Sequence, residues 1–133
     1  MTTAPTRQPF GEAWIAEYFA DVDRLDPASM LRWYAEDCSF RFGGNPTLRG
    51  KSAIAAALAG FYGTIAGMRH EMTGCWIDRD AHSGVWEAEV TFTRPDGSRV
   101  TIPAISSLRL RDGLIHDFRF VMDPAPLHGT DHG

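Results

Sequence analysis

The sequence predicts an α+β fold: three N-terminal helices packed on one face of a curved, mainly antiparallel sheet, enclosing a pocket. Two observations predict it. Apolar residues recur with the period of a helix in the first half of the chain, and beyond Gly67 they alternate with polar residues, as in strands with one buried face. Tight turns separate the alternating segments. Helices followed by hairpins are typical of an α+β domain.

The two helices nearest the N-terminus have the clearest local signals. The stretch Phe10–Asp23 carries apolar residues at helical spacing and predicts an amphipathic helix. Asp26-Pro27 combines an N-cap residue with a proline at the first helical position. We therefore predict a second helix over residues 26–36 that buries Tyr34.

The remaining elements follow in chain order. Cys38–Phe42 alternates as a short strand, and Gly50–Ser52 opens a third helix. Pro95–Gly97 and Asp112-Gly113 are typical of hairpin turns. The long strands predicted around these turns are Met68–Asp78, Val85–Arg94, Ser98–Arg111 and Leu114–Met122. In the segment Val85–Arg94, the residues Trp86, Ala88, Val90 and Phe92 share one face and polar residues from Glu87 to Thr93 share the other, so the sheet has one packed and one wet face.

Length and composition predict one ordinary globular domain. The chain has 133 residues, and we expect a flexible arm over 1–9, one domain over 10–127 and a flexible tail over 128–133. The net charge of −4, with Lys51 as the only lysine, argues against a nucleic-acid surface. No stretch has the apolar length of a membrane span or signal peptide, so we expect a cytoplasmic protein without membrane contact.

Metal binding and disulfide formation are not expected. Cys38 and Cys75 lack the spacing of metal ligands, and two isolated cysteines are more typical of reduced thiols packed as small hydrophobes. We therefore predict no metal site and no disulfide.

Several motifs resemble those of the nuclear-transport-factor-2-like superfamily, and within it the SnoaL-like, or polyketide-cyclase-like, branch. They are Asp26-Pro27, Ala35–Asp37, Gly50–Ile54, Asp112–Ile115 and Asp123–Leu127. The resemblance implies a cone-shaped fold with a mainly apolar cavity between the helices and the sheet. It also implies a homodimer formed through the outer face of the sheet.

The resemblance allows known chemistries of this fold to be compared with this chain. Against ketosteroid isomerases, Tyr18 falls where those enzymes carry an oxyanion-binding tyrosine, but Phe42 falls at the general base and Ser106 at the protonated aspartate. Against limonene epoxide hydrolases, Phe120 falls at a catalytic aspartate. A scytalone-dehydratase-like site would use two histidines and an aspartate, and no inward aspartate is evident. The sequence therefore argues against steroid isomerisation and epoxide hydrolysis by those mechanisms.

The candidate site residues are inward polar groups and aromatics. We predict Tyr18 as a hydrogen-bond donor and His70 as the proton carrier, with His116 as a second candidate because it shares strand parity with Phe118 and Phe120. The predicted ligand-binding residues are Trp14, Phe42, Trp86, Ser106, His116, Phe118 and Phe120.

Three functions fit these residues. The first is an acid/base enzyme of cyclase, isomerase or dehydratase type, without a cofactor, acting on a hydrophobic or aromatic small molecule. The second is a non-catalytic small-molecule binding protein of the same fold. The third is a scaffold whose cavity is filled by Phe42, Trp86, Phe118 and Phe120. Solvent-facing histidines at 70 and 116 would remove the proton carriers that the enzyme needs.

Overall fold

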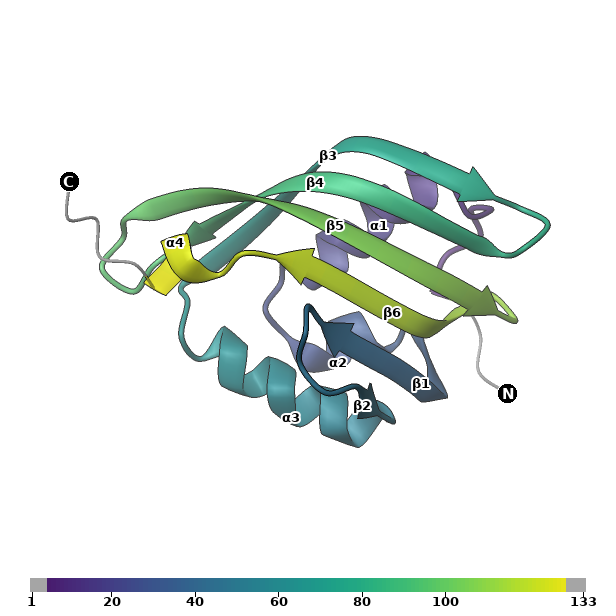
Figure 1. Cartoon of the computed structure of the whole chain (residues 1–133), viewed down its shortest axis with the longest axis horizontal. Helices are drawn as coiled ribbons and strands as arrows, with labels where there is room; N and C mark the ends of the chain where they lie inside the picture. The colour runs from purple at the N-terminus through teal and green to yellow at the C-terminus, as the bar shows by residue number, and fades with distance from the viewer. Residues whose placement is uncertain (1–4, 129–133) are drawn as a thin grey trace.

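The computed structural model describes residues 5–128 and forms one layered body (Figure 1). The helices are α1 (Glu12–Val22), α2 (Pro27–Leu31), α3 (Lys51–Tyr62) and α4 (Ala125–His128). The strands are β1 (Tyr34–Phe42), β2 (Leu48–Arg49), β3 (Gly67–Asp78), β4 (Ser83–Thr93), β5 (Arg99–Arg111) and β6 (Leu114–Met122). Residues 1–4 and 129–133, which include part of the predicted arm and most of the predicted tail, lie outside the described range.

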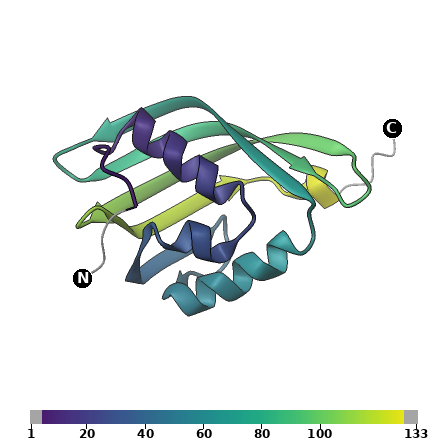
Figure 2. The same ribbon diagram turned by 180° about the vertical axis from the view of Figure 1, so that it is seen from behind.

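The strands form one six-stranded sheet in the order β2-β1-β6-β5-β4-β3. The β1–β6 pair is parallel, and the other pairs are antiparallel. The helices α1, α2 and α3 lie on one face of this curved sheet (Figure 2). The predicted α+β class, with N-terminal helices on a mainly antiparallel sheet, is confirmed.

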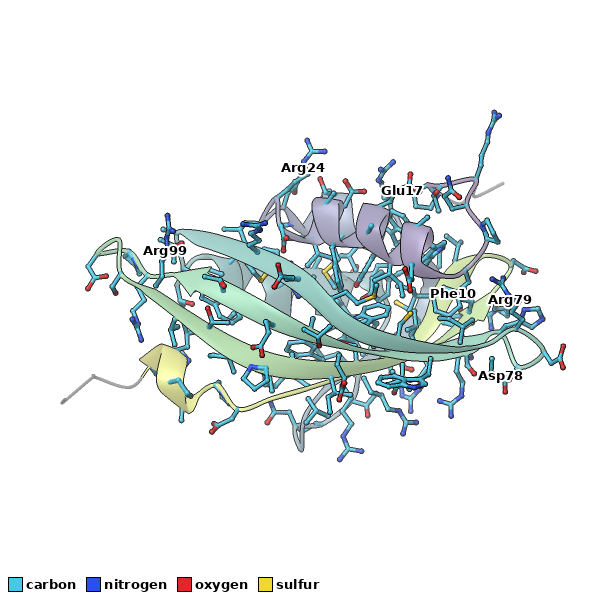
Figure 3. All side chains as sticks on the ribbon, turned by 90° about the horizontal axis from the view of Figure 1, so that it is seen from above. Phe10, Glu17, Arg24, Asp78, Arg79 and Arg99 are labelled. Carbon is cyan, nitrogen blue, oxygen red and sulfur yellow. The ribbon has the colours of Figure 1, made fainter. Side chains whose placement is uncertain are left out.

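The helix α1 is amphipathic as predicted. Trp14, Ile15 and Tyr18 are among its buried residues, while the side chain of Glu17 points away from the sheet (Figure 3). This orientation follows from the 3.6-residue period, because the apolar stripe must face the sheet.

The predicted second helix is wrong beyond Leu31. Asp26 caps α2 as expected, its carboxylate accepting the Ala28 N–H at 3.2 Å, but the helix ends after five residues. Tyr34 instead begins β1 and pairs with Ile115 of β6. Two contacts with α1 favour the extended chain: the Trp33 indole reaches Asp21, and the Tyr34 hydroxyl reaches Tyr18.

A buried carboxylate joins α1 to the start of β1. Asp21 accepts hydrogen bonds from Trp33 Nε1 at 2.8 Å and from Arg32 Nε and Nη2 at 3.0 and 2.7 Å. Burial alone would raise the pKa of Asp21, but these hydrogen bonds and the Arg32 charge outweigh it and lower the pKa. The corner between helix and sheet is thereby fixed.

The hairpins form at both predicted turns. β4 and β5 flank Pro95–Gly97, and β5 and β6 flank Asp112-Gly113. The short elements β2 and α4 were not predicted. Arg94 holds α4 by donating to the carbonyls of Pro126 and Leu127 at 2.7 and 3.2 Å. Cys38 and Cys75 are free thiols, as expected.

Candidate functional site

The space where the sequence analysis placed a ligand is largely occupied by aromatic side chains. Tyr18 lies at the centre of this cluster, with ring centroids 5.6 Å from Trp14, 5.8 Å from Trp86 and 6.2 Å from Phe118. Trp14, Trp86 and Phe118 are themselves at most 4% exposed. Three of the predicted ligand-binding residues therefore pack around Tyr18 as part of the hydrophobic core.

The Tyr18 hydroxyl already has a partner inside the protein. It lies 2.6 Å from the Tyr34 hydroxyl, and either group can be the donor in this pair. Burial is the main reason that the pKa of each tyrosine lies well above its ordinary value. Both hydroxyls therefore remain protonated, and the role of Tyr18 as a donor to a ligand stays a prediction.

The other predicted aromatic and polar groups lie farther along the sheet. The Phe42 and Phe120 rings are 5.2 Å apart and only half-buried. Ser106 is buried and pairs in register with Trp86 on one side and Phe120 on the other. The structure brings these residues together on the inner face, at the junction of two core clusters.

A bulge changes the environment predicted for His116. In the β5–β6 pairing Arg109 is opposite Asp117 and Leu110 is opposite Ile115, so His116 is an extra residue. Simple alternation with Phe118 and Phe120 therefore fails at this position. His116 Nδ1 is buried and has no hydrogen-bond partner; no other buried side-chain nitrogen or oxygen among the non-exposed residues of 5–128 lacks one.

His70 forms a bonded pair with a carboxylate that the sequence analysis missed. His70 Nδ1 lies 2.7 Å from Asp23 Oδ1, and the His70 backbone N–H donates to Asp23 Oδ2 at 2.9 Å. The side chains of His70 and Asp23 are 8% and 21% exposed. The centre of the His70 ring also lies 4.8 Å from that of Phe19. Two hydrogen bonds to Asp23 and this ring contact therefore fix the position of His70.

The two residues come from elements that the fold brings side by side. Asp23 caps the end of α1, and His70 lies in β3, the last strand of the sheet. A helical projection of the sequence contained part of this signal, since Asp23 is four residues after Phe19 and so shares its face. Its partner is 47 residues away, a separation that periodicity does not cover.

The His70–Asp23 pair lines a hollow of about 320 Å³ between α1 and β3. The other lining residues are Ala16, Phe19, Ala20, Arg69 and Met72. His70 Nε2 has no hydrogen bond among residues 5–128, yet it is not one of their enclosed unpartnered atoms. This nitrogen therefore reaches open space, in a mainly apolar setting typical of small-molecule sites.

The geometry assigns distinct tasks to the two ring nitrogens. An ionised carboxylate only accepts hydrogen bonds, so the nitrogen facing Asp23 carries the proton. In the neutral ring Nε2 then has a free lone pair and can take a proton from a ligand. Asp23 thereby fixes the tautomer and the orientation of the ring, as the carboxylate of a catalytic triad does.

The charge of Asp23 acts on the hydroxyl of a nearby tyrosine, Tyr62. Tyr62 donates to the weak acceptor Met30 Sδ at 3.4 Å. Burial, and then the charges of Asp23 and Asp26, raise the pKa of Tyr62 to about 12. Tyr62 thus remains a protonated group at neutral pH.

The outer face of the sheet carries a second hollow, of about 280 Å³, over β3, β4 and β5. Val85 lies next to the core residue Trp86 in β4 and so faces the opposite side, together with its register partners Trp76 and Ser107. Trp76 is 58% exposed. Within residues 5–128 there is no group of three or more His, Cys, Asp or Glu side chains placed to hold a metal ion.

None of the helices formed by the described residues is long and apolar enough to span a membrane. No curated protein sequence is significantly similar to this chain.

Solved structures with the same fold cover most of the chain. TerC, co-crystallised with polyporic acid, has a TM-score of 0.72 at 20% identity, covering 86% of this chain and 92% of TerC. A nuclear-transport-factor-2-like protein of unknown function from Burkholderia pseudomallei has a TM-score of 0.73 at 18% identity, with coverages of 85% and 90%. A putative SnoaL-like polyketide cyclase from Jannaschia has a TM-score of 0.70 at 14% identity, with coverages of 92% and 94%.

These identities show a shared fold and leave the chemistry to the residues of each site. A family model described as the SnoaL-like domain matches residues 15–118. The chain therefore belongs to the SnoaL-like domain family and has the nuclear-transport-factor-2-like fold.

Proposed function

We propose that this protein is an acid/base enzyme acting on a hydrophobic or aromatic small molecule, with His70 as the proton carrier. The observation that carries the proposal is the His70–Asp23 pair, bonded at 2.7 Å on the wall of a mainly apolar hollow. Such a pair transfers protons without a cofactor. Isomerisation, dehydration and cyclisation can each begin with proton removal next to a carbonyl, so the proposal includes all three reaction types.

In the proposed mechanism the ligand lies against the apolar wall formed by Phe19 and Met72. His70 Nε2 removes a proton from the ligand, and the Nδ1–H bond to Asp23 stabilises the charged ring. The same nitrogen then returns the proton to another atom of the ligand or to a leaving hydroxyl.

Solvent hydrogen exchange tests this mechanism without knowledge of the substrate. A panel of aromatic and terpenoid ketones in D₂O is followed by ¹H NMR, and the protein is expected to speed deuterium uptake next to the carbonyl of at least one compound. His70→Gln should slow that uptake by about 10²–10⁴-fold, and Asp23→Asn should also slow it. The matched control is His82→Asn, because His82 is exposed in the β3–β4 turn with φ 50°, which asparagine tolerates. Equal rates for His70→Gln and the unchanged protein would refute the assignment.

A non-catalytic small-molecule binding protein is the second candidate. The filled interior favours it, because Tyr18 and Trp86 are only 2% exposed and so cannot contact a substrate. Any catalysis would then depend on the residues of the α1–β3 hollow. The exchange panel separates the two candidates. If the chain is a binding protein, at least one compound should raise its melting temperature, and no compound should take up deuterium faster in its presence.

The proposed protein is a homodimer that associates through the outer face of the sheet. Its support is the set of exposed large hydrophobic side chains on β3, β5 and β6: Trp76, Ile105 and Val121, which are 58%, 46% and 58% exposed. Ile105 and Val121 are opposite each other on neighbouring strands and so form one continuous apolar surface. Sedimentation at micromolar concentrations should show a dimer, and Ile105→Lys should shift it to a monomer. A monomeric wild-type chain would refute this part.

A further inference from the structure

The outer face of the sheet carries a group of negative charges on β3 and β4. Glu71 and Glu89 are opposite each other in register, and Glu87 shares their face two residues along β4. Glu89 is next to the buried Val90, so these three glutamates, the acidic cluster, lie on the face away from the core. None of them takes part in the ion pairs formed by residues 5–128. Arg69, two residues before Glu71 on β3, leaves the region with a net negative charge.

The strands β1, β5 and β6 carry positive charges on the same face. Arg41 of β1 and Arg119 of β6 are opposite each other in register. Arg109 of β5 shares their face, since its register partner Asp117 is two residues before Arg119 on β6. Asp117 is shared between Arg109 and Arg119, and Arg41 takes no part in the ion pairs formed by residues 5–128. These three arginines, the basic cluster, therefore outnumber the carboxylate beside them.

Exposed apolar side chains lie between the two clusters. Trp76 of β3 is level with Ser107 in the register of the sheet, two residues along β5 from Ile105. Val121 of β6 is directly opposite Ile105. Trp76, Ile105 and Val121 therefore follow a diagonal across the strands that Figure 1 shows side by side. The acidic cluster lies on one side of this apolar diagonal, and the basic cluster lies on the other.

This pattern is unfavourable in an isolated chain and favourable in a symmetric pair. Like charges directly opposite each other destabilise a sheet, and Glu71 with Glu89 and Arg41 with Arg119 are such pairs. A two-fold dimer uses the same surface of both chains. If the two-fold axis follows the apolar diagonal, the acidic cluster of each chain faces the basic cluster of its partner. The apolar residues of the two chains then meet along the axis.

We propose that a second copy of the chain binds the outer face in this one orientation, with the acidic cluster of each chain against the basic cluster of its partner. The inference rests on the proposed function, in which the outer face is the dimer interface, and it names the pairing within that interface. Burial of the apolar diagonal supplies affinity. The charges determine the orientation, because any other rotation brings like charges together.

Two charge-reversal variants of the full chain test the orientation. Glu71→Lys/Glu89→Lys and Arg41→Glu/Arg119→Glu each reverse the sign of a like-charged pair, so the repulsion within one chain stays similar and both should remain folded by circular dichroism. Each variant alone should dimerise at least about tenfold more weakly in sedimentation, because its clusters then meet clusters of the same sign. Added salt should also weaken the wild-type dimer, because it screens the attraction between the clusters.

An equimolar mixture of the two variants is the sharpest measurement. In the mixed pair the new lysines of one chain face the new glutamates of the other, and the unchanged clusters also face each other. A heterodimer with about the wild-type affinity should therefore form, and native mass spectrometry distinguishes it from either homodimer. The matched control is Glu12→Lys/Glu17→Lys, which changes the net charge by the same amount at exposed positions of α1. This control should dimerise like the wild-type chain.

The outcomes distinguish this inference from the proposed function. Unweakened dimers of the two variants, a mixture without heterodimer, or a wild-type dimer that salt does not weaken would each overturn the orientation. The outer-face dimer itself would still stand if Ile105→Lys gave a monomer. A monomeric wild-type chain, or a dimer that survives Ile105→Lys, would refute both. The deuterium-uptake panel tests the enzyme proposal separately, because His70 lies on the inner face.

Discussion

The buried pair of tyrosine hydroxyls makes a quantitative prediction about stability. Tyr18 and Tyr34 are 2% and 0% exposed, and their hydroxyls are 2.6 Å apart. Replacing either one with phenylalanine removes one partner and leaves the other hydroxyl buried without a bond. Such an orphaned group costs about 1–3 kcal/mol, and we expect about 2 kcal/mol of lost stability for each single variant. For a chain of this length that corresponds to a melting temperature lower by roughly 5–10 °C.

The double variant should behave differently from the sum of the singles. Tyr18→Phe/Tyr34→Phe removes both hydroxyls, so neither is orphaned, and we expect a loss of at most about 1 kcal/mol. The coupling energy is then about −3 kcal/mol, the double loss minus the two single losses. Urea unfolding followed by tryptophan fluorescence measures all four proteins. Additive losses would refute the reasoning, because they would mean that the two hydroxyls do not depend on each other.

The same variants test the predicted role of Tyr18 in the site. If the Tyr18 hydroxyl donates to a ligand, Tyr18→Phe should slow deuterium uptake at temperatures where the variant is fully folded. If the hydroxyl serves only Tyr34, the uptake rate should be unchanged once folding is complete. Stability and uptake rate therefore separate the two roles.

Three further predictions concern the core and the titrating groups. Asp21→Asn should destabilise the protein by about 2 kcal/mol at neutral pH, because Arg32 and Trp33 lose a charged acceptor. The pKa of Asp21 is lowered in the folded state, so its contribution to stability is present above pH 3.8 and is lost as the pH falls through the folded pKa. A plot of unfolding free energy against pH should therefore fall less steeply in acid for the variant than for the unchanged protein. The free energy of unfolding should fall as the pH rises from 10.0 through about 12, because burial raises the pKa of Tyr62 from 10.0 to about 12 in the folded state. Absorbance of tyrosinate should therefore appear together with unfolding. A tyrosinate signal from the folded protein at pH 10 would contradict the burial argument. Gly84→Ala should cost about 1–3 kcal/mol in urea unfolding, because its Cβ would lie 2.7 Å from Phe10 Cε2, whereas Gly44→Ala, which meets no atom within 4 Å, should cost little.

Local signals were sufficient for the turns and caps. Pro95–Gly97 and Asp112-Gly113 formed hairpins as predicted, because turn chemistry depends on adjacent residues. The end of α2 depended on tertiary contacts instead. Trp33 and Tyr34 leave the helical path to bond with Asp21 and Tyr18, and no pattern near residue 32 records those partners.

The site was predictable only in part for the same reason. His70 was chosen as a candidate because histidine is the side chain that ordinarily titrates near neutral pH. Its carboxylate was missed because no inward aspartate was evident from the sequence, and Asp23 comes from the end of α1, 47 residues before His70. His116 was placed by alternation, which assumes a regular ladder, and the bulge beside Ile115 breaks that assumption.

Asp23 has a second effect on the edge of the sheet. An unpaired edge strand is a template on which another chain can add a strand and begin aggregation. Asp23 Oδ2 covers one backbone donor on that edge, the N–H of His70. The carboxylate that bonds to the histidine ring therefore also occupies one of the backbone donors with which another strand could pair at this edge. Asp23 therefore has a structural role at the edge of the sheet that is independent of the proposed proton transfer.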